Sequence, residues 1–363
     1  MRIGIILEHS DPRRGGAEAF ARGLAERLVA HGHAAVIASR TGEHARPVAS
    51  FPAALRPRFY ASAFLPWLRA QGCERVLTVP PVPGCEFFMP RNGILAASLP
   101  PRLEPLPAPL RAFKRCNPAR ALHFALRRSF EARAAAPPTR VLAISPRVVR
   151  DLATHHPGAL PPLLLRSGVD LNRFHPAGAR TRLAVRKALS IPQRPLLLFV
   201  GHNFALKGLA TALRALALLP EAGLAVVGRG RPAPYRRLAR RLGVAGRLFW
   251  QPDDRHLRAL YRAAHLLVHP THYDTASRVV LESLASGTPS VTTARDGNAD
   301  LVLASGGEVL PHPGDADALA GAARRLCSVS RAESGARARA VAELCPEEPL
   351  LDRVVEAITS AMS

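Results

Sequence analysis

The feature that most limits the possible folds of this chain is an alternation of apolar runs and helical segments, which occurs in two separate series. Early in the chain, an apolar run at residues 2–7 precedes an amphipathic segment at 17–31, and a second apolar run follows at 34–39. Later, an apolar run at 196–200 precedes a helical segment at 207–219. Strands that alternate with helices form parallel sheets covered on both faces. We therefore predict an α/β protein with two Rossmann-like, doubly wound domains.

The same pattern places the other elements and the boundary between the two series. We expect further strands at residues 75–79, 140–144, 224–227, 248–250, 263–270 and 289–293. We expect further helices at residues 146–154, 234–242, 255–264, 315–326 and 349–362. Turn-forming residues at 166–176 separate an apolar run from a polar, arginine-rich stretch, so the join is predicted there.

Length and composition exclude several classes of protein. A chain of 363 residues with 48% apolar and 21% charged residues is globular and long enough for two domains. No stretch approaches the roughly 20 apolar residues of a membrane span, and the first apolar run stops at Glu8, too early for a signal peptide. Five scattered cysteines without a CxxC pair indicate neither a disulfide framework nor a zinc site. We expect a cytoplasmic protein.

The basic charge is concentrated in one part of the chain. The formal net charge is +23, and residues 91–150 alone carry twelve basic and two acidic side chains. Within them, a proline-rich connector is expected at 100–110 and one helix at 111–133, where apolar side chains alternate with arginines. Such a segment suits an anionic membrane surface or a phosphorylated acceptor, but a solvated arginine-rich helix has the same sequence. Nucleic acid is not expected as a partner, since no nucleic-acid-binding motif accompanies the charge.

Three loops that follow predicted strands carry candidate anion-binding residues. Gly15 and Gly16 form a turn that opens a helix, where backbone N–H groups can meet an anion, although an ordinary tight turn looks the same. Lys207 stands at a helix start, where the helix dipole disfavours a cation unless an anion binds. Lys207 is therefore a candidate to stabilise a leaving diphosphate. Arg229 lies in the loop after the next strand, which either borders this site or is simply solvated.

An acidic pair, Asp274 and Glu282, brackets the start of the helix that follows the strand predicted at 263–270. The carboxyl ends of strands in α/β sheets face the ligand crevice, and carboxylates accept hydrogen bonds from vicinal hydroxyl groups. One acid is thus suited to a ribose and the other to a hexose. Solvated surface acids would give the same spacing.

Together these loops resemble the retaining glycosyltransferases of family 4, which have the GT-B fold. The resemblance is closest to the branch that contains the lipopolysaccharide core glucosyltransferases. It covers essentially the whole chain, and its more specific parts are residues 167–176, 201–208, 274–282 and 287–291. The third of these is similar to the family's pair of acids separated by seven residues.

The resemblance implies two Rossmann-like domains that face a central crevice. Residues 1–168 would bind the acceptor, residues 169–344 would bind the nucleotide sugar, and a helix within 345–363 would pack back on the first domain. The reaction implied is retaining transfer of a hexose from a nucleotide-diphosphate sugar, preferably a UDP-sugar, to a cell-envelope glycan or glycolipid. Neither a further cofactor nor a metal is expected.

Roles for individual residues follow from the same resemblance. Glu282 would bind the ribose, Asp274 the hydroxyls of the transferred sugar, and Lys207 the diphosphate. The glycine turn, the loop after the second strand of the later series and the start of the helix after Asp274 would complete the donor site, with Gly15, Gly16, Arg229, Ser277 and Arg278.

Three positions depart from the family pattern. Leu206 replaces an arginine that precedes the lysine, and Asp274 is one methylene shorter than the usual glutamate. Arg91 occupies a loop where relatives carry a histidine or an aspartate near the reacting carbon, which makes Arg91 a further catalytic candidate. Alternatives to an active transferase are a catalytically weakened nucleotide-sugar-binding protein and, less favoured, a nucleic-acid-binding protein or a GT-B epimerase or phosphorylase.

Overall fold

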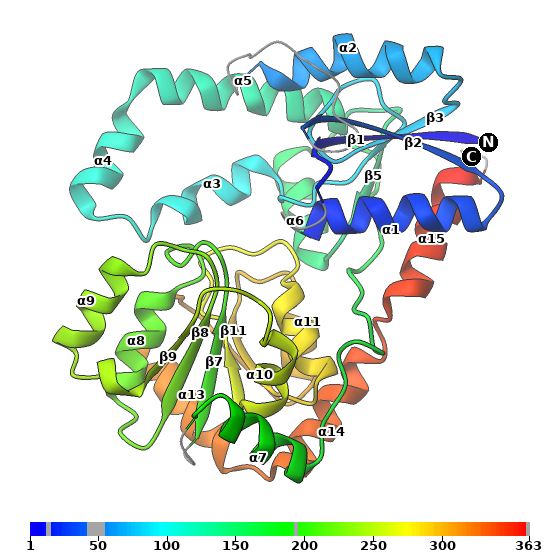
Figure 1. Ribbon diagram of the computed structural model, residues 1–363. Helices are drawn as coiled ribbons and strands as arrows, with labels where there is room; N and C mark the ends of the chain where they lie inside the picture. The colour runs from blue at the N-terminus through cyan, green and yellow to red at the C-terminus, as the bar shows by residue number, and fades with distance from the viewer. Residues whose placement is uncertain (12–15, 42–54, 192–194, 361–363) are drawn as a thin grey trace. The chain divides into compact units, whose positions relative to one another are not determined.

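The computed structural model describes residues 1–11, 16–41, 55–191 and 195–360. The chain divides into two compact units, the first comprising Met1–Ser167 and Glu348–Ser363 and the second Gly168–Glu347. Each unit is built on a six-stranded sheet (Figure 1). The chain first passes from one unit to the other between Ser167 and Gly168.

The first unit contains a parallel sheet with the strand order β2-β1-β3-β4-β5-β6. The chain passes from β1 to β2 on one side and then returns to β3 on the other side of β1. Its strands are β1 (Arg2–His9), β2 (Ala34–Thr41), β3 (Arg75–Thr78), β4 (Phe87–Phe88), β5 (Arg140–Ala143) and β6 (Leu163–Leu164). Its helices are α1 (Gly16–Ala30), α2 (Arg56–Ala70), α3 (Leu95–Leu103), α4 (Ala108–Cys116), α5 (Pro118–Ala135), α6 (Pro146–His155) and, returning from the end of the chain, α15 (Glu347–Thr359).

The second unit repeats this scheme with the parallel order β12-β11-β10-β7-β8-β9. Here the reversal falls between β7 and β10. The strands are β7 (Leu196–Val200), β8 (Gly223–Val227), β9 (Leu248–Gln251), β10 (Leu266–Val268), β11 (Ser290–Thr293) and β12 (Glu308–Leu310). The helices are α7 (Ala179–Ala188), α8 (Leu209–Ala217), α9 (Ala233–Arg241), the 3₁₀ turn η1 (Ala245–Arg247), α10 (Leu257–Ala263), α11 (Arg278–Ala285), α12 (Ala299–Ala304), α13 (Ala316–Ser328) and α14 (Arg331–Ala342).

Strand β7 shows why the second sheet must be covered on both faces. All five of its residues are buried. Leu197 and Phe199 belong to a core cluster with residues of α8 and α13, whereas Leu198 and its alternate neighbours belong to a cluster with residues of α10 and α11. Because successive side chains of a strand point to opposite faces, this continuous apolar run stabilises two helical layers at once.

Two expectations for the basic segment are wrong. Residues 111–133 do not form one helix, because α4 ends at Cys116 and α5 begins at Pro118. Asn117 separates them, and its Oδ1 accepts a hydrogen bond from the backbone N of Arg120 at 3.0 Å. Asn before a proline at the first helical position is a strong helix start. The stretch 100–110 is also not all connector, since α3 runs to Leu103.

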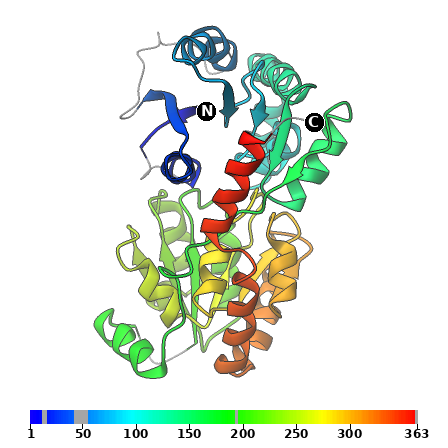
Figure 2. The same cartoon turned by 90° about the vertical axis from the view of Figure 1, so that its right-hand side faces the viewer.

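Helix α15, red in Figure 2, belongs to the first unit from Glu348 onward. Arg27 of α1 donates through Nε and Nη2 to the carboxylate of Asp352, at 2.5 Å each. Arg75 at the start of β3 donates to the carbonyl oxygen of Ile358. The side chains of Val354, Val355 and Ile358 are buried.

Candidate functional site

The reversal between β7 and β10 determines where the sequence candidates of the second unit meet. The two strands pair Leu197 with Leu266 and Leu198 with Leu267, so their carboxyl ends lie side by side. Ligands of open α/β sheets bind beyond the carboxyl ends of the strands at such a reversal. Lys207 lies in the loop that follows β7, and Asp274 lies in the loop that follows β10. The topology alone therefore brings these two candidates together.

Close backbone packing holds the two loops against each other. Gly208 has φ +80°, and a Cβ at this position would lie 2.0 Å from the carbonyl oxygen of Pro270. The backbone N of His272 donates to the carbonyl oxygen of Leu206 at 2.8 Å. Only glycine fits this left-handed, tightly packed position. The turn at Gly208 thus fixes the start of the Lys207 side chain beside the β10 loop.

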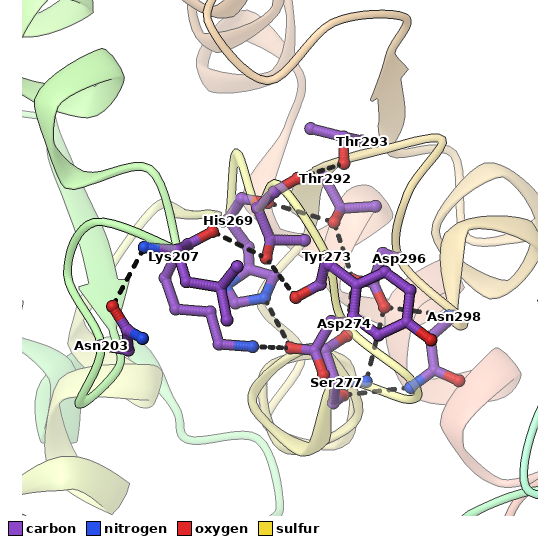
Figure 3. A network of polar contacts seen from close by, with 12 residues as sticks. Asn203, Lys207, His269, Tyr273, Asp274, Ser277, Thr292, Thr293, Asp296 and Asn298 are labelled. Atoms are coloured by element: carbon purple, nitrogen blue, oxygen red, sulfur yellow. Dashed lines mark hydrogen bonds and ion pairs between the residues drawn. The ribbon is translucent and has the colours of Figure 1, made fainter. Parts of the chain in front are cut away.

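Lys207, Asp274 and His269 form a polar cluster at this point (Figure 3). Asp274 Oδ2 accepts from Lys207 Nζ and also from His269 Nε2, the latter at 3.1 Å. The side chains of Lys207 and Asp274 are 19% and 18% exposed, whereas that of His269 is 0% exposed. Burial acts to raise the pKa of Asp274, but the charge of Lys207 and the hydrogen bond from His269 outweigh it and hold this pKa well below its usual range. Asp274 is therefore a fixed anion.

A second, fully buried carboxylate fixes the start of α11. Asp296, 1% exposed, accepts from Ser277 Oγ at 2.6 Å, from Thr292 Oγ1 at 2.7 Å and from the backbone N of Asn298 at 3.0 Å. Ser277 occupies the N-cap position of α11, but its side chain makes no capping hydrogen bond. The first turn of α11 thus has no side-chain cap, although the backbone N of Val280 donates to the carbonyl oxygen of Ser277 at 3.2 Å, and the positive end of the helix dipole lies there too. This is an arrangement suited to phosphate oxygens.

Glu282 lies one turn further along α11, and its side chain is 12% exposed. Its Oε2 accepts from the hydroxyl of Tyr261 at 2.9 Å, and Arg278 Nε lies 3.7 Å from its Oε1. Burial raises the pKa of Glu282, and Arg278 and Tyr261 offset only part of that effect. A carboxylate held at low dielectric with a fixed hydroxyl donor accepts strong hydrogen bonds from a diol.

The remaining candidates come from other loops of the two units. Arg229 is exposed in the loop after β8, and its backbone N donates to His202 Nδ1 at 3.3 Å. Arg91, in the first unit, places its guanidinium 4.3 Å from the ring centre of Phe20. Gly16 is the first residue of α1, whereas Gly15 lies outside the described residues. The structure therefore groups Lys207 with Asp274, and Ser277 with Arg278 and Glu282.

The first unit has its own cavity of about 470 Å³ beyond the carboxyl ends of β1, β3 and β4. Glu8, at the end of β1, accepts from Tyr60 at 2.7 Å and from Arg56 at 2.8 Å. Asn92 also lines this cavity, but its neighbour Arg91 is not among the lining residues described. Charged and hydroxyl side chains at a sheet reversal are typical of a polar-ligand site.

The sequence reasoning missed His269, Tyr261, Asp296 and Asn298. His269 ends an apolar run and so resembled part of a buried strand. Asp296 lies 22 residues after Asp274 in a separate turn, and only the adjacent positions of β10 and β11 bring the two loops together. A polar residue directly after a buried strand is the signal that could have found His269, whereas Asp296 comes three residues after the end of β11 and lacks that signal.

Across the described ranges, no group of three or more His, Cys, Asp or Glu residues is placed to hold a metal ion. In the same part of the chain, no helix combines the length and the apolar character needed to cross a bilayer.

Comparison with known proteins agrees with this geometry. Residues 182–341, within the second unit, match the family model for glycosyl transferases group 1. The lipopolysaccharide glucosyltransferase WaaG of Escherichia coli (strain K12) is 37% identical over 127 residues, which are 33% of this chain and 34% of WaaG. A D-inositol 3-phosphate glycosyltransferase of Mycolicibacterium paratuberculosis is 34% identical over 200 residues, 52% of this chain and 45% of that protein. The matches thus span a third to under a half of these relatives.

Solved structures match over the whole chain. The crystal structure of WaaG superposes with a TM-score of 0.82 at 23% identity, covering 99% of this chain and 100% of that one. HepE from Anabaena in complex with UDP-glucose gives a TM-score of 0.75 at 17% identity, with 99% and 100% coverage. The predicted GT-B fold and the resemblance to family 4 glycosyltransferases near the WaaG branch are confirmed. Residues 182–341 match the model of the glycosyl transferases group 1 family, in a chain that has the fold of WaaG.

Proposed function

We propose that this protein is a retaining glycosyltransferase that moves a hexose from a nucleotide-diphosphate sugar to a hydroxyl group of a cell-envelope glycan or glycolipid. The observation that carries this proposal is the contact of Lys207 with Asp274 at the β7–β10 reversal, four residues before the uncapped start of α11. A cation and a helix N-terminus suit a diphosphate, and the carboxylates suit sugar hydroxyls. HepE, which has the same fold, binds UDP-glucose, and this supports a UDP-sugar as the donor.

The chemistry requires little from a protein base. The acceptor oxygen would attack the anomeric carbon on the face from which the diphosphate leaves, as the bond from that carbon to the diphosphate oxygen breaks. The departing oxygen takes the proton of the acceptor hydroxyl, so the anomeric configuration is retained. Lys207 would stabilise the charge that develops on the diphosphate, Asp274 would orient the transferred sugar, and Glu282 would hold the ribose.

The direct test is sugar transfer from UDP-sugars to lipopolysaccharide core acceptors, with the anomeric configuration of the product determined by NMR. Lys207→Ala is expected to lower the transfer rate about 10²- to 10³-fold, because one donor to a developing charge is lost. Lys187→Ala is the matched control, since Lys187 is exposed in the last turn of α7. Equal rates in the two variants, or a product of inverted configuration, would contradict the proposal.

A second candidate is a nucleotide-sugar-binding protein with little transfer activity. It is favoured by Leu206, which supplies no second cation beside Lys207, and by the engagement of Lys207 with Asp274. Calorimetry that detects binding of a UDP-sugar, combined with neither transfer to any acceptor nor hydrolysis of the donor, would support this alternative.

We also propose that the protein acts in the cytoplasm and that α4 contacts an anionic membrane surface. Among the residues of α4 none is buried, and Phe113 is 66% exposed between Arg111, Lys114 and Arg115. Apolar and basic side chains together bind anionic bilayers. In vesicle sedimentation, Phe113→Ser should weaken binding to phosphatidylglycerol vesicles and not change the weak binding to phosphatidylcholine. Equal sedimentation of both proteins with anionic vesicles would refute this.

A further inference from the structure

Two donors share one oxygen of Asp274, and they differ in how firmly they are held. Lys207 Nζ and His269 Nε2 both donate to Oδ2, and no described residue hydrogen-bonds to Oδ1. Lys207 reaches Oδ2 with a flexible, partly exposed side chain. His269 reaches it from the buried end of β10.

The surroundings of His269 fix its position and its tautomer. Its backbone N donates to Val291 at 2.8 Å, and its carbonyl oxygen accepts from Thr271 N at 2.7 Å and from Thr292 Oγ1 at 3.1 Å. Its Nδ1 is buried with no hydrogen-bond partner. A proton on Nδ1 would be a buried, unsatisfied donor, so the ring carries its proton on Nε2 and donates it to Asp274.

In the proposed function, Lys207 must serve the diphosphate, and this weakens or removes its bond to Asp274. Without another donor, the carboxylate of Asp274 would then be a nearly buried anion that is free to rotate. Such a group would turn toward Lys207 and compete with the diphosphate for it. His269 prevents this, because it cannot leave Oδ2.

We infer that His269 is a positioning residue that keeps Oδ2 of Asp274 occupied while Lys207 contacts the diphosphate, so that Oδ1 is presented to a hydroxyl of the transferred sugar. This inference rests on the proposed function. It also accounts for a shorter acid at position 274, because a short side chain clamped at one oxygen presents the other in one direction. His269 itself touches neither the donor nor the acceptor.

The experiment compares the dissociation constants of UDP and UDP-glucose by calorimetry in wild type, His269→Leu and His269→Gln. UDP has the diphosphate and the ribose but lacks the glucose, so the ratio of the two constants isolates the contribution of the glucose. In His269→Leu, the advantage of UDP-glucose over UDP should fall about tenfold, the equivalent of one charged hydrogen bond. In His269→Gln, whose amide places an N–H near the position of Nε2, the advantage should return to within about threefold of wild type.

If His269 were purely structural, its replacement would weaken the binding of both ligands equally. An unchanged ratio of the two dissociation constants in His269→Leu therefore overturns the inference. A wild type that binds UDP-glucose no better than UDP overturns it as well. If the wild type binds neither ligand, the result contradicts the proposed function itself, not only the role of His269. Histidine ¹⁵N NMR of the free protein gives a test that needs no donor and no leucine variant. The ring signal that disappears in His269→Gln should show the Nε2–H tautomer, and an Nδ1–H tautomer there would refute the assignment.

Discussion

Replacing the buried carboxylate of Asp296 tests whether it stabilises the contact between the start of α11 and the loop that follows β11. In Asp296→Ala, the hydroxyls of Ser277 and Thr292 can rotate toward other acceptors, but the backbone N–H of Asn298, now 3.0 Å from Oδ1, cannot. The N–H of Ser277, at 3.4 Å from the same oxygen, also loses its acceptor. Each buried donor without a partner costs about 1–3 kcal/mol, so the two together give a loss of about 2–6 kcal/mol in the free energy of unfolding.

The assay is urea unfolding followed by tryptophan fluorescence. The chain has two tryptophans, Trp67 in α2 of the first unit and Trp250 in β9 of the second. A Trp67→Phe background therefore leaves a probe that reports the unit containing Asp296. Asp317→Ala is the matched control, because Asp317 is an exposed acid in the first turn of α13. A loss below about 1 kcal/mol in Asp296→Ala, or equal losses in both variants, would refute the reasoning.

Two further predictions concern neighbouring positions. Burial raises the pKa of Glu282, so the folded protein binds its proton more tightly than the unfolded chain, and stability is lost as pH rises through the folded pKa. Glu282→Gln should therefore raise the melting temperature at pH 7 and weaken UDP binding. The gain in melting temperature should vanish below about pH 4, under the pKa of glutamate in the unfolded chain. A gain that persists there would contradict a raised pKa of Glu282 in the folded protein. Gly208→Ala should lower the free energy of unfolding by more than about 1 kcal/mol, because its Cβ would meet Pro270. An unchanged melting curve would show that this turn can shift.

The sequence predicted those parts of the fold whose signal is local. The apolar run at 196–200 coincides with β7, and α6 begins at Pro146, where the helix at 146–154 was expected to begin. Ser145 caps α6, since its Oγ accepts from the backbone N of Val148 at 3.4 Å. Helix α2 was not predicted, because Pro66 interrupts its pattern, and it forms through the burial of Tyr60, Phe64 and Leu68. Local propensity gave no indication of that tertiary packing.

The residues of the candidate site also include some that the local sequence predicted and some that it did not. Lys207, Asp274 and Glu282 could be found because each lies at a strand–helix junction, where chain polarity alone predicts the ligand side of the sheet. The roles of His269 and Asp296 depend on which oxygen of a carboxylate is occupied and on a contact between loops from two strands. Neither is encoded in the spacing of residues along the chain, so neither could be predicted without the structure.

Helix α15 has a consequence for the order in which this protein folds during its synthesis. The second unit is continuous in the chain and is complete once residue 347 has left the ribosome, whereas the first unit needs Val354, Val355 and Ile358 to close its core. Although its sheet is made first, the first unit is therefore finished last. Its apolar surface stays exposed during the translation of about half of these residues, so this unit is where chains truncated before α15 should aggregate.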